Sequence, residues 1–555
     1  MVAVPVTGGR PDAQEPAVAR SAGLIGGLTL ASRFAGFARI LVFTALVGAQ
    51  ALGDIYQSVN TLPNIVFEIV AGGALASVVV PLVAGRLSDR GSVDRIASAL
   101  LTWAVLVLAV LAIVVAVFAR PIVEWLLTSP QHGAPSPAAV AVGERMLLVF
   151  APQLVLYGIG VVLTGVLQAH HRFAGPALAP LLSSLTVIAA YGVFRAAGGT
   201  QVLGGLSRTA ELILSVGTTL GVVVLSLSLL VPLRGTGVRL RPALRFPPGV
   251  SAQARTLVGG GVLAVVGQQV ALLVVIKLSR PPAAPDGSLV LYTVAQTLFL
   301  LPWAVLAVPV ATSAFPRMSA SFAAGDLAAY RSSFASAARA VVLLTALGSA
   351  ALVAGAEPLA WVVPHGGADP GRLAWAIAAF GPGLAGYGLL ALVSRAMYAA
   401  GAARATAAVT IGGWAVVIAA AVTLALALPQ SARAAALAGG QSVGMTILGG
   451  ALLVLAARHT GRGSLAGLAR TGAVAAVAAV VSAAAGLGVV ALVPASGLAG
   501  HLAEGIAVGL TVLVVFAVVA VAGDPSDARR IARPLTRRLG GRISRRLAPT
   551  EGENP

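Results

Sequence analysis

Long apolar stretches recur along the whole chain and constrain its fold more than any other feature. A window of about 20 residues finds fourteen of them, each long enough to cross a bilayer as a helix. Hydrophobic residues make up 58% of the 555 residues and charged residues only 10%. Because backbone groups find no water to bond inside lipid, segments of this length must be helical. The sequence predicts an all-α, polytopic integral membrane protein with about 14 transmembrane helices.

The first twelve predicted spans form two weakly similar halves. Residues 167–172 after the fourth span align with 399–404 after the tenth at an offset of 232, and Pro63 and Pro302 lie within helices near the second span of each half. Six spans per half is an even number, so the halves are expected to be parallel pseudo-repeats with substrate between them. We predict a disordered cytoplasmic N-terminus at 1–23, a six-helix lobe at 24–232, a cytoplasmic linker at 233–256, a second six-helix lobe at 257–457, two extra transmembrane helices at 458–522 and a basic cytoplasmic tail at 523–555.

The distribution of basic residues predicts the orientation in the membrane. With a cytoplasmic N-terminus, 26 of the 37 Lys and Arg residues fall in cytoplasmic segments and only 6 in the opposite loops. This bias follows the positive-inside rule and places both termini in the cytoplasm. The net charge of +19 is then mostly arginine that faces anionic lipid headgroups, so we do not expect a nucleic-acid partner.

The residues present also exclude several chemistries. The chain has no cysteine, so it can form neither a disulfide nor a thiolate metal site. We find no nucleophile triad, phosphate-binding loop or zinc-protease motif, and His170 and His171 lack further ligand-type partners. We therefore expect no enzymatic activity, no catalytic residue, no metal and no cofactor.

Two arginines lie inside the first apolar span, residues 24–48. At 1.5 Å per residue, Arg33 is about 14 Å and Arg39 about 22 Å from the start of that span. A charge at such a depth costs roughly 2.5 to 3.5 kcal/mol on insertion scales. Side chains this deep cannot reach the interface, which favours a polar cavity between helices as their surroundings.

The sequence around these arginines resembles the opening of the MurJ/MviN lipid II flippases, a family of the multidrug/oligosaccharidyl-lipid/polysaccharide exporter superfamily. The matching residues are Leu30 to Arg39, Gly53-Asp54, Leu62-Pro63-Asn64, Gly73-Ala74, Arg172 to Pro180, Leu301-Pro302 to Phe315-Pro316 and Tyr398 to Arg404. The motifs cover residues 24 to about 410, and the fourteen spans agree with the family.

The resemblance implies a flippase that moves undecaprenyl-pyrophosphate-linked disaccharide-peptide to the outer leaflet by alternating access. Arg33 and Arg39 are then the expected headgroup ligands, because guanidinium forks bind pyrophosphate oxygens bidentately. The family's acidic residue before the second span corresponds to Asp54, and the asparagine of its Leu-Pro-Asn motif to Asn64. Pro63 frees a carbonyl within the span and is a candidate gating bend.

The chain departs from the family pattern after that motif. Where many members carry two arginines and a glutamate, this chain has Phe67, Glu68 and Gly72, and near Thr297 it lacks the arginine of many eighth spans. Counting inward from the outer end of its span, Glu68 lies at about the level of Arg33. We therefore predict that Glu68 pairs with Arg33 and belongs to the substrate site.

Structural and functional alternatives remain open from the sequence. The Arg33–Glu68 pair could only lock two helices together, Asp54 could be a helix N-cap, and Asn64 could bond neighbouring helices. The alternative functions are a small-molecule or drug antiporter and a non-transporting scaffold for envelope assembly. The expected partners are a lipid-linked oligosaccharide, membrane lipids and cell-wall synthesis proteins, with a monomer in the bacterial plasma membrane.

Overall fold

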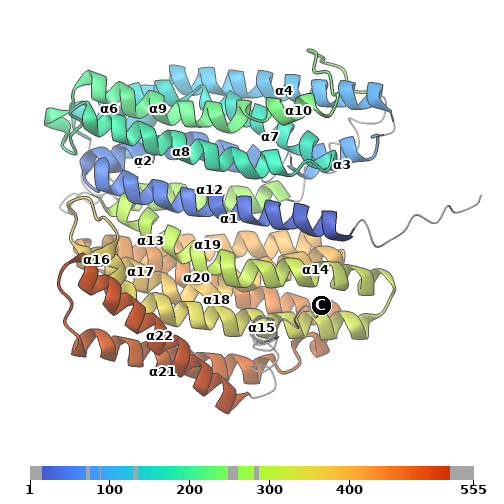
Figure 1. Ribbon diagram of the computed structural model, residues 1–555, viewed down its shortest axis with the longest axis vertical. Helices are drawn as coiled ribbons and strands as arrows, with labels where there is room; N and C mark the ends of the chain where they lie inside the picture. Colours follow the sequence, from blue (N-terminus) through green and yellow to red (C-terminus); the bar gives the residue numbers. More distant parts are fainter. Residues whose placement is uncertain are drawn as a thin grey trace, which may run out of the picture. The chain divides into compact units, whose positions relative to one another are not determined.

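The computed structural model describes residues 15–70, 76–87, 89–128, 135–247, 261–279 and 287–524. In these ranges the chain forms helices joined by turns and irregular segments, and twelve helical segments are long and apolar enough to cross a membrane (Figure 1). Two predicted spans lie partly outside the described residues: the second includes 71–75, and the seventh begins before residue 261. The all-α membrane fold is confirmed, and the count of fourteen is approximate.

The chain divides into two compact units, which are described separately. Unit 1 comprises Met1–Thr128 and Gly133–Gln269, and unit 2 comprises Ser129–His132 and Val270–Pro555. The helices of unit 1 are α1 (Glu15–Leu46), α2 (Ala51–Glu68), α3 (Ala76–Ala84), α4 (Arg90–Val117), α5 (Ala119–Leu127), α6 (Pro137–Phe150), α7 (Gln153–Ala169), α8 (Ala174–Ala196), the short 3-10 helix η3 (Leu203–Gly205), α9 (Arg208–Leu227) and α10 (Leu230–Arg234).

Unit 2 repeats this order and adds a final helical hairpin. Helix α12 (Gly261–Leu278) contains the boundary between the units. The following elements are α13 (Ser288–Pro302), η4 (Trp303–Ala307), α14 (Val308–Ala323), α15 (Leu327–Ala354), α16 (Ala356–Val362), α17 (Pro370–Phe380), η5 (Gly381–Gly383), α18 (Leu384–Ala399), α19 (Ala403–Ala427), η6 (Gln430–Ala432), α20 (Arg433–Thr460), η7 (Arg462–Leu465), α21 (Leu468–Leu492) and α22 (Gly497–Gly523).

Matching features at matching places support the internal repeat. Each unit has a short helix after a 28-residue one, α5 after α4 and α16 after α15, and both short helices expose a tryptophan, Trp125 and Trp361. A break at a proline then divides α6 from α7 at Pro152 and α17 from α18 at Pro382. Proline explains these breaks because its ring removes a helix hydrogen bond.

The register of the repeat differs from the predicted offset of 232. Helices α7 and α18 end alike, with a left-handed residue after the cap: His171 with φ 57° and Gly401 with φ 73°. In both helices, the amide of the next residue donates to the carbonyl five positions earlier. Arg172 donates to Leu167 at 2.9 Å, and Ala402 donates to Met397 at 2.8 Å. The aligned pair is therefore His171 with Gly401, two residues from the alignment predicted by side-chain similarity. A left-handed helix end fixes the register because few residues adopt it.

His171 occupies a backbone conformation that glycine adopts more easily. For an L-residue with a Cβ, the left-handed region costs roughly 1 kcal/mol. We expect His171→Gly to stabilise the protein by about 0.5 to 1 kcal/mol, and the matched Gly401→His to destabilise it by a similar amount. Thermal unfolding of the purified chain checks both. Equal melting temperatures for the two variants would contradict this assignment of the helix ends.

Small residues let the helices of unit 2 approach closely. A Cβ added to Gly440 would lie 2.4 Å from the Ala421 backbone, and one added to Gly444 would lie 2.2 Å from Val417. Because lipid offers no hydrophobic force between helices, close backbone packing of this kind is what holds membrane helices together. It joins α19 to α20 as an antiparallel pair.

Candidate functional site

Arg33 and Arg39 of α1 are both exposed on the surface of unit 1. The apolar part of α1 is the 20-residue segment Gly27–Leu46, and each arginine lies about 10 Å from its nearer end. Among the residues that the structure describes, no carboxylate lies within ion-pair distance of Arg33 or Arg39. Exposure to lipid would be costly at this depth, so these charges require a polar environment or an anionic ligand.

The predicted Arg33–Glu68 ion pair is absent, although both residues are described and both are exposed. The physical reason is the packing of their helices. Phe43 near the end of α1 stacks on Tyr56 near the start of α2 with ring centroids 5.1 Å apart. Away from this point, α1 packs mainly on α8, whereas α2 packs on α6 and α7. Equal depth in the membrane therefore does not make the two side chains neighbours, and the interpretation as a helix-locking pair is wrong for this structure.

Tyr157 of α7 brings several predicted site residues together. Its hydroxyl donates a hydrogen bond of 2.7 Å to Oδ1 of Asn64, and its ring lies 4.5 Å from that of Phe67, centroid to centroid. The charges of Arg39 and Glu68 both act electrostatically on the same hydroxyl. Tyr157, which the sequence did not single out, thus contacts Asn64 and Phe67 and lies within the electrostatic reach of Arg39 and Glu68.

A buried polar network supports this group from the side of α8 and α9. The Tyr56 hydroxyl bonds the Tyr191 hydroxyl at 3.0 Å and the Thr218 hydroxyl at 2.7 Å. The Arg39 charge also acts on Tyr56 and Tyr191. Three helices, α2, α8 and α9, therefore join their hydroxyl groups in one network, and buried networks of this kind fix side-chain geometry when their members are satisfied.

Asp54 is placed differently from the other predicted ligands. It is 4% exposed, so neighbouring helices enclose its carboxylate. Helix α2 begins at Ala51 with Gln50 as its N-cap, and the Asp54 amide donates to the Gln50 carbonyl at 3.0 Å. Asp54 therefore lies inside the first turn, and the alternative that it is the N-cap is wrong. Its role in substrate binding stays a prediction.

Pro63 lies inside α2, which continues through it to Glu68. Ile69 and Val70, six and seven residues after the proline, adopt π-helical geometry. In unit 2 a π-helix also follows a proline, but directly: Pro302 ends α13 and Trp303–Ala307 forms a π-helix. Proline leaves a carbonyl without its helical donor, and π-turns are frequent at functional sites. The paired positions support the prediction that this part of α2 bends.

Phe67, Gln296 and Thr297, which stand at or near positions where many family members carry arginine, have local partners. Phe67 packs on Tyr157 as described above. In unit 2, Gln296 donates weakly to Tyr292 and Gln441, each at 3.4 Å, and the Thr297 hydroxyl bonds the carbonyl of Thr293 at 2.8 Å. These positions stabilise their own unit and add no positive charge.

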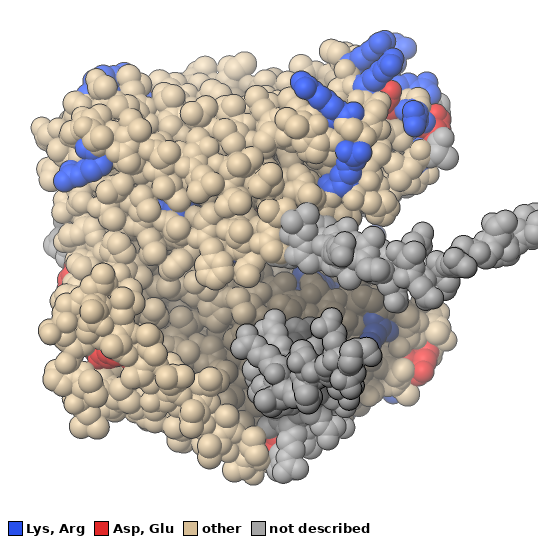
Figure 2. Space-filling view, viewed as in Figure 1, with Lys and Arg blue, Asp and Glu red and all other residues tan. Residues whose placement is uncertain are grey.

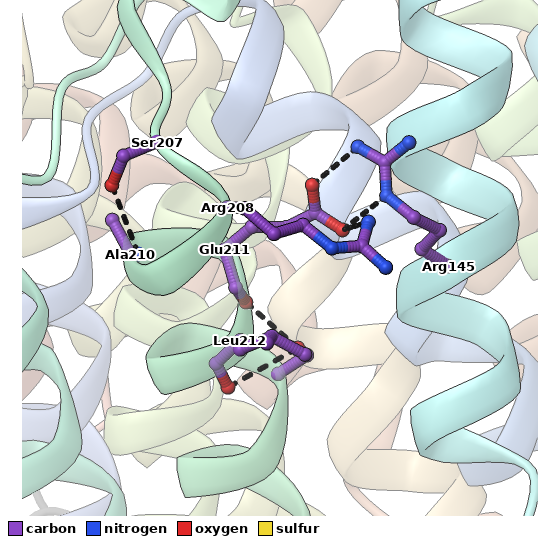
Figure 3. A network of polar contacts seen from close by, with 7 residues as sticks. Arg145, Ser207, Arg208, Ala210, Glu211 and Leu212 are labelled. Atoms are coloured by element: carbon purple, nitrogen blue, oxygen red, sulfur yellow. Dashed lines mark hydrogen bonds and ion pairs between the residues drawn. The ribbon is translucent and has the colours of Figure 1, made fainter.

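A buried carboxylate elsewhere in unit 1 joins α6 to α9. Glu211 accepts from Arg145 at two atoms, with Nε to Oε1 at 2.8 Å, and Arg208 lies 3.4 Å from Oε1 (Figure 3). The side chains of Arg145 and Glu211 are 34% and 3% exposed. Glu211 lies in the first turn of α9, where the helix dipole favours an acid. The sequence did not predict this ion pair because Arg145 and Glu211 are 66 residues apart.

Tyr157→Phe tests whether the bond to Asn64 organises the site. Removing the hydroxyl leaves a partly buried amide oxygen without its donor, which should cost about 1 kcal/mol of stability. In a protein that already carries Asn64→Ala, the same change should cost much less. A double-mutant cycle of unfolding free energies measures the difference. Strictly additive effects would show that the 2.7 Å contact does not couple the two residues.

Membrane-spanning helices in two similarly built units define the class as a multi-pass membrane protein. A family model described as lipid II flippase MurJ matches residues 43–508, and the chain belongs to this family. A probable lipid II flippase MurJ from Rhizobium meliloti is 26% identical over 55% of this chain and 55% of its own length. The lipid II flippase MurJ of Burkholderia cenocepacia is 27% identical over 68% of this chain and 72% of its own length.

The match to the first of these relatives thus spans about half of its length. Among solved structures, the lipid II flippase MurJ in an inward closed conformation superposes with a TM-score of 0.69 at 17% identity, covering 90% of this chain and 99% of that one. An inward-facing MATE family transporter of the MOP superfamily gives a TM-score of 0.62 at 14% identity, covering 78% and 96%. At these identities the superpositions establish the fold alone.

Proposed function

We propose that this protein moves lipid II, the undecaprenyl-pyrophosphate-linked peptidoglycan precursor, from the inner to the outer leaflet by alternating access. The observation that carries the proposal is the pair of exposed arginines in the apolar part of α1, with no carboxylate at ion-pair distance among the described residues. A protein keeps such charges at depth only where a ligand or a polar cavity stabilises them. Family membership makes the pyrophosphate of lipid II the natural ligand.

The surroundings of Arg39 suit an anionic headgroup. A guanidinium stays charged at any physiological pH and binds phosphate oxygens as a fork. The hydroxyls of Tyr56, Tyr157 and Tyr191 lie within its electrostatic range. Glu68 acts on Tyr157 as well, and a negative charge there would limit how long an anion stays. Binding that is strong enough to load and weak enough to release is what alternating access requires.

The driving force can come from the membrane potential. Outward movement of an anion is favoured by about 2.3 kcal/mol per charge per 100 mV when the charge crosses the full field. We infer from the family that the protein acts as a carrier with no catalytic step, in the bacterial cell membrane. The drug antiporter alternative is supported only by the shared fold of the MATE structures.

The proposed orientation has both termini in the cytoplasm. A reporter inserted after residue 367, between α16 and α17, should report the outer side, and one at the C-terminus the inner side. Equal activity of a cytoplasmic reporter at both positions would overturn the orientation.

Complementation tests the function itself. We expect this gene to restore growth and normal shape to bacteria depleted of their own lipid II flippase. The matched negative control is Arg33→Gln with Arg39→Gln, which removes the proposed ligands but leaves the aromatic network of Tyr56 intact. Rescue by this variant at equal membrane abundance would show that the arginines do not bind substrate.

A further inference from the structure

An extended segment of unit 1, residues 238–246, is fastened along α4 by a regular set of hydrogen bonds. We call it the strap. The amides of Arg239, Arg241 and Ala243 donate to side-chain oxygens of Asp94, Ser98 and Thr102 at 3.0, 2.9 and 3.0 Å. At the far end, Nε1 of Trp103 donates to the carbonyl of Leu244 at 3.0 Å.

The spacing of these bonds explains why they repeat. Four residues of a helix advance about 6 Å, and two residues of an extended chain advance about 6.5 Å. Acceptors at 94, 98 and 102 therefore match donors at 239, 241 and 243 over two steps. Such a built-in match makes the strap an ordered surface feature and not a loose linker.

The two sides of the strap differ in chemistry. Val238, Leu240 and Phe246 pack on the apolar core of α3, α4 and α7. The side chains of Arg239, Arg241 and Arg245 are exposed, and so is Leu244, at 59%. Further exposed basic residues lie nearby at Arg90, Arg95 and Arg234, against two acids, Asp89 and Asp94. Figure 2 shows the basic side chains gathered over this end of α4.

The position of the strap along α4 places it at the membrane surface. Helix α4 has 28 residues, about 42 Å, and the hydrocarbon core needs only about 30 Å. Helix α5 follows at once at the other end, so the excess lies at the start of α4. Asp94 and Ser98 are then at headgroup level, with Trp103 slightly deeper. The arginines of the strap then lie among the headgroups, and the exposed side chains of Trp103 and Leu244 lie at the boundary with the acyl chains.

We propose that the strap is a docking surface for anionic phospholipid headgroups of the inner leaflet. It rests on the proposed cytoplasmic location of this end of α4 and is independent of which substrate the protein moves. Each arginine near an anionic leaflet adds to the electrostatic attraction. The fixed backbone of the strap keeps three arginines in one row. The exposed apolar side chains at one end of the strap favour a lipid over an acidic protein segment. A lipid contacts the arginines with its headgroup and these apolar side chains with its acyl chains, whereas an acidic protein segment would contact only the arginines.

Native mass spectrometry of the full chain in mixed phosphatidylglycerol and phosphatidylcholine tests the proposal. The variant Arg239→Gln, Arg241→Gln, Arg245→Gln keeps every backbone bond of the strap but removes its charge. We expect its preference for phosphatidylglycerol to fall by at least about tenfold. The matched control replaces three exposed arginines of unit 2, Arg404, Arg458 and Arg462, with Gln. It should change the preference for phosphatidylglycerol little.

Two further measurements separate a built site from diffuse charge. Ser98→Ala with Thr102→Val releases two strap bonds without changing charge, and the preference should still fall, with membrane abundance as the folding control. Inorganic phosphate should not displace the lipid. An unchanged preference in the strap variant, an equal loss in the control, or displacement by free phosphate would overturn the proposal. Loss of binding to an acidic cytosolic protein alone, with the lipid preference unchanged, would also overturn it.

Discussion

Arg39→Lys should abolish transport nearly as completely as Arg39→Ala. A lysine keeps the positive charge, but it cannot offer two parallel donors to a pyrophosphate, and a charged hydrogen bond is worth roughly 1.5 to 3 kcal/mol. We expect a loss of roughly tenfold to hundredfold in the rate of flipping. The measurement is complementation of a flippase-depleted strain, followed by the rate of lipid II translocation, with membrane abundance checked by blot. Wild-type transport by the lysine variant would show that a point charge is sufficient.

Arg33 provides the matched comparison, and the structure sharpens it. Because Arg33 and Glu68 form no ion pair, removing both charges should not restore what removing Arg33 destroys. We expect Arg33→Gln and the double variant Arg33→Gln, Glu68→Gln to fold and to fail alike. A double variant that transports normally would restore the interpretation of these residues as a structural pair.

Glu211→Ala should give the largest loss of stability. Arg145 would lose both of its acceptor atoms, and breaking a buried ion pair typically costs about 3 to 5 kcal/mol. Because the Arg145 side chain is 34% exposed, water will compensate part of this, and we expect about 2 to 3 kcal/mol. Thermal unfolding in a fixed detergent measures the effect.

The control for that variant removes both charges together. Arg145→Met with Glu211→Leu replaces the pair by apolar side chains, which is often neutral for buried pairs. The double variant should recover most of the lost stability, leaving only the exposed Arg208 without its acid. A double variant as unstable as Glu211→Ala would mean that the cost comes from packing and not from an unpaired charge.

The fold could be predicted from the sequence because its causes are local. A run of 20 apolar residues must be helical in lipid, so twelve of the expected spans are found among the described residues. The repeat was also visible, but its register was not. Side-chain similarity aligned His171 with Ala403, whereas the left-handed helix ends align His171 with Gly401, since the backbone conformation is not written in side-chain type.

The site was only partly predictable for a related reason. Arg33 and Arg39 are conspicuous because a charge in an apolar span is rare and costly. Tyr157 is not, since tyrosine is ordinary in a membrane helix, and its bond to Asn64 joins residues 93 apart. The false Arg33–Glu68 pair arose from depth alone. Depth follows from residue number, but neighbours depend on which faces of α1 and α2 turn toward each other.

Inner-leaflet lipid II tests the central claim most directly. Depletion of this protein in its own host, followed by labelling of lipid II in each leaflet, should show accumulation on the inner side within a few generations and a matching loss on the outer side. Re-expression of the wild-type chain should reverse the change, and the Arg39→Ala chain should not. Normal lipid II in both leaflets after depletion, together with altered drug tolerance, would contradict the flippase account and favour an antiporter.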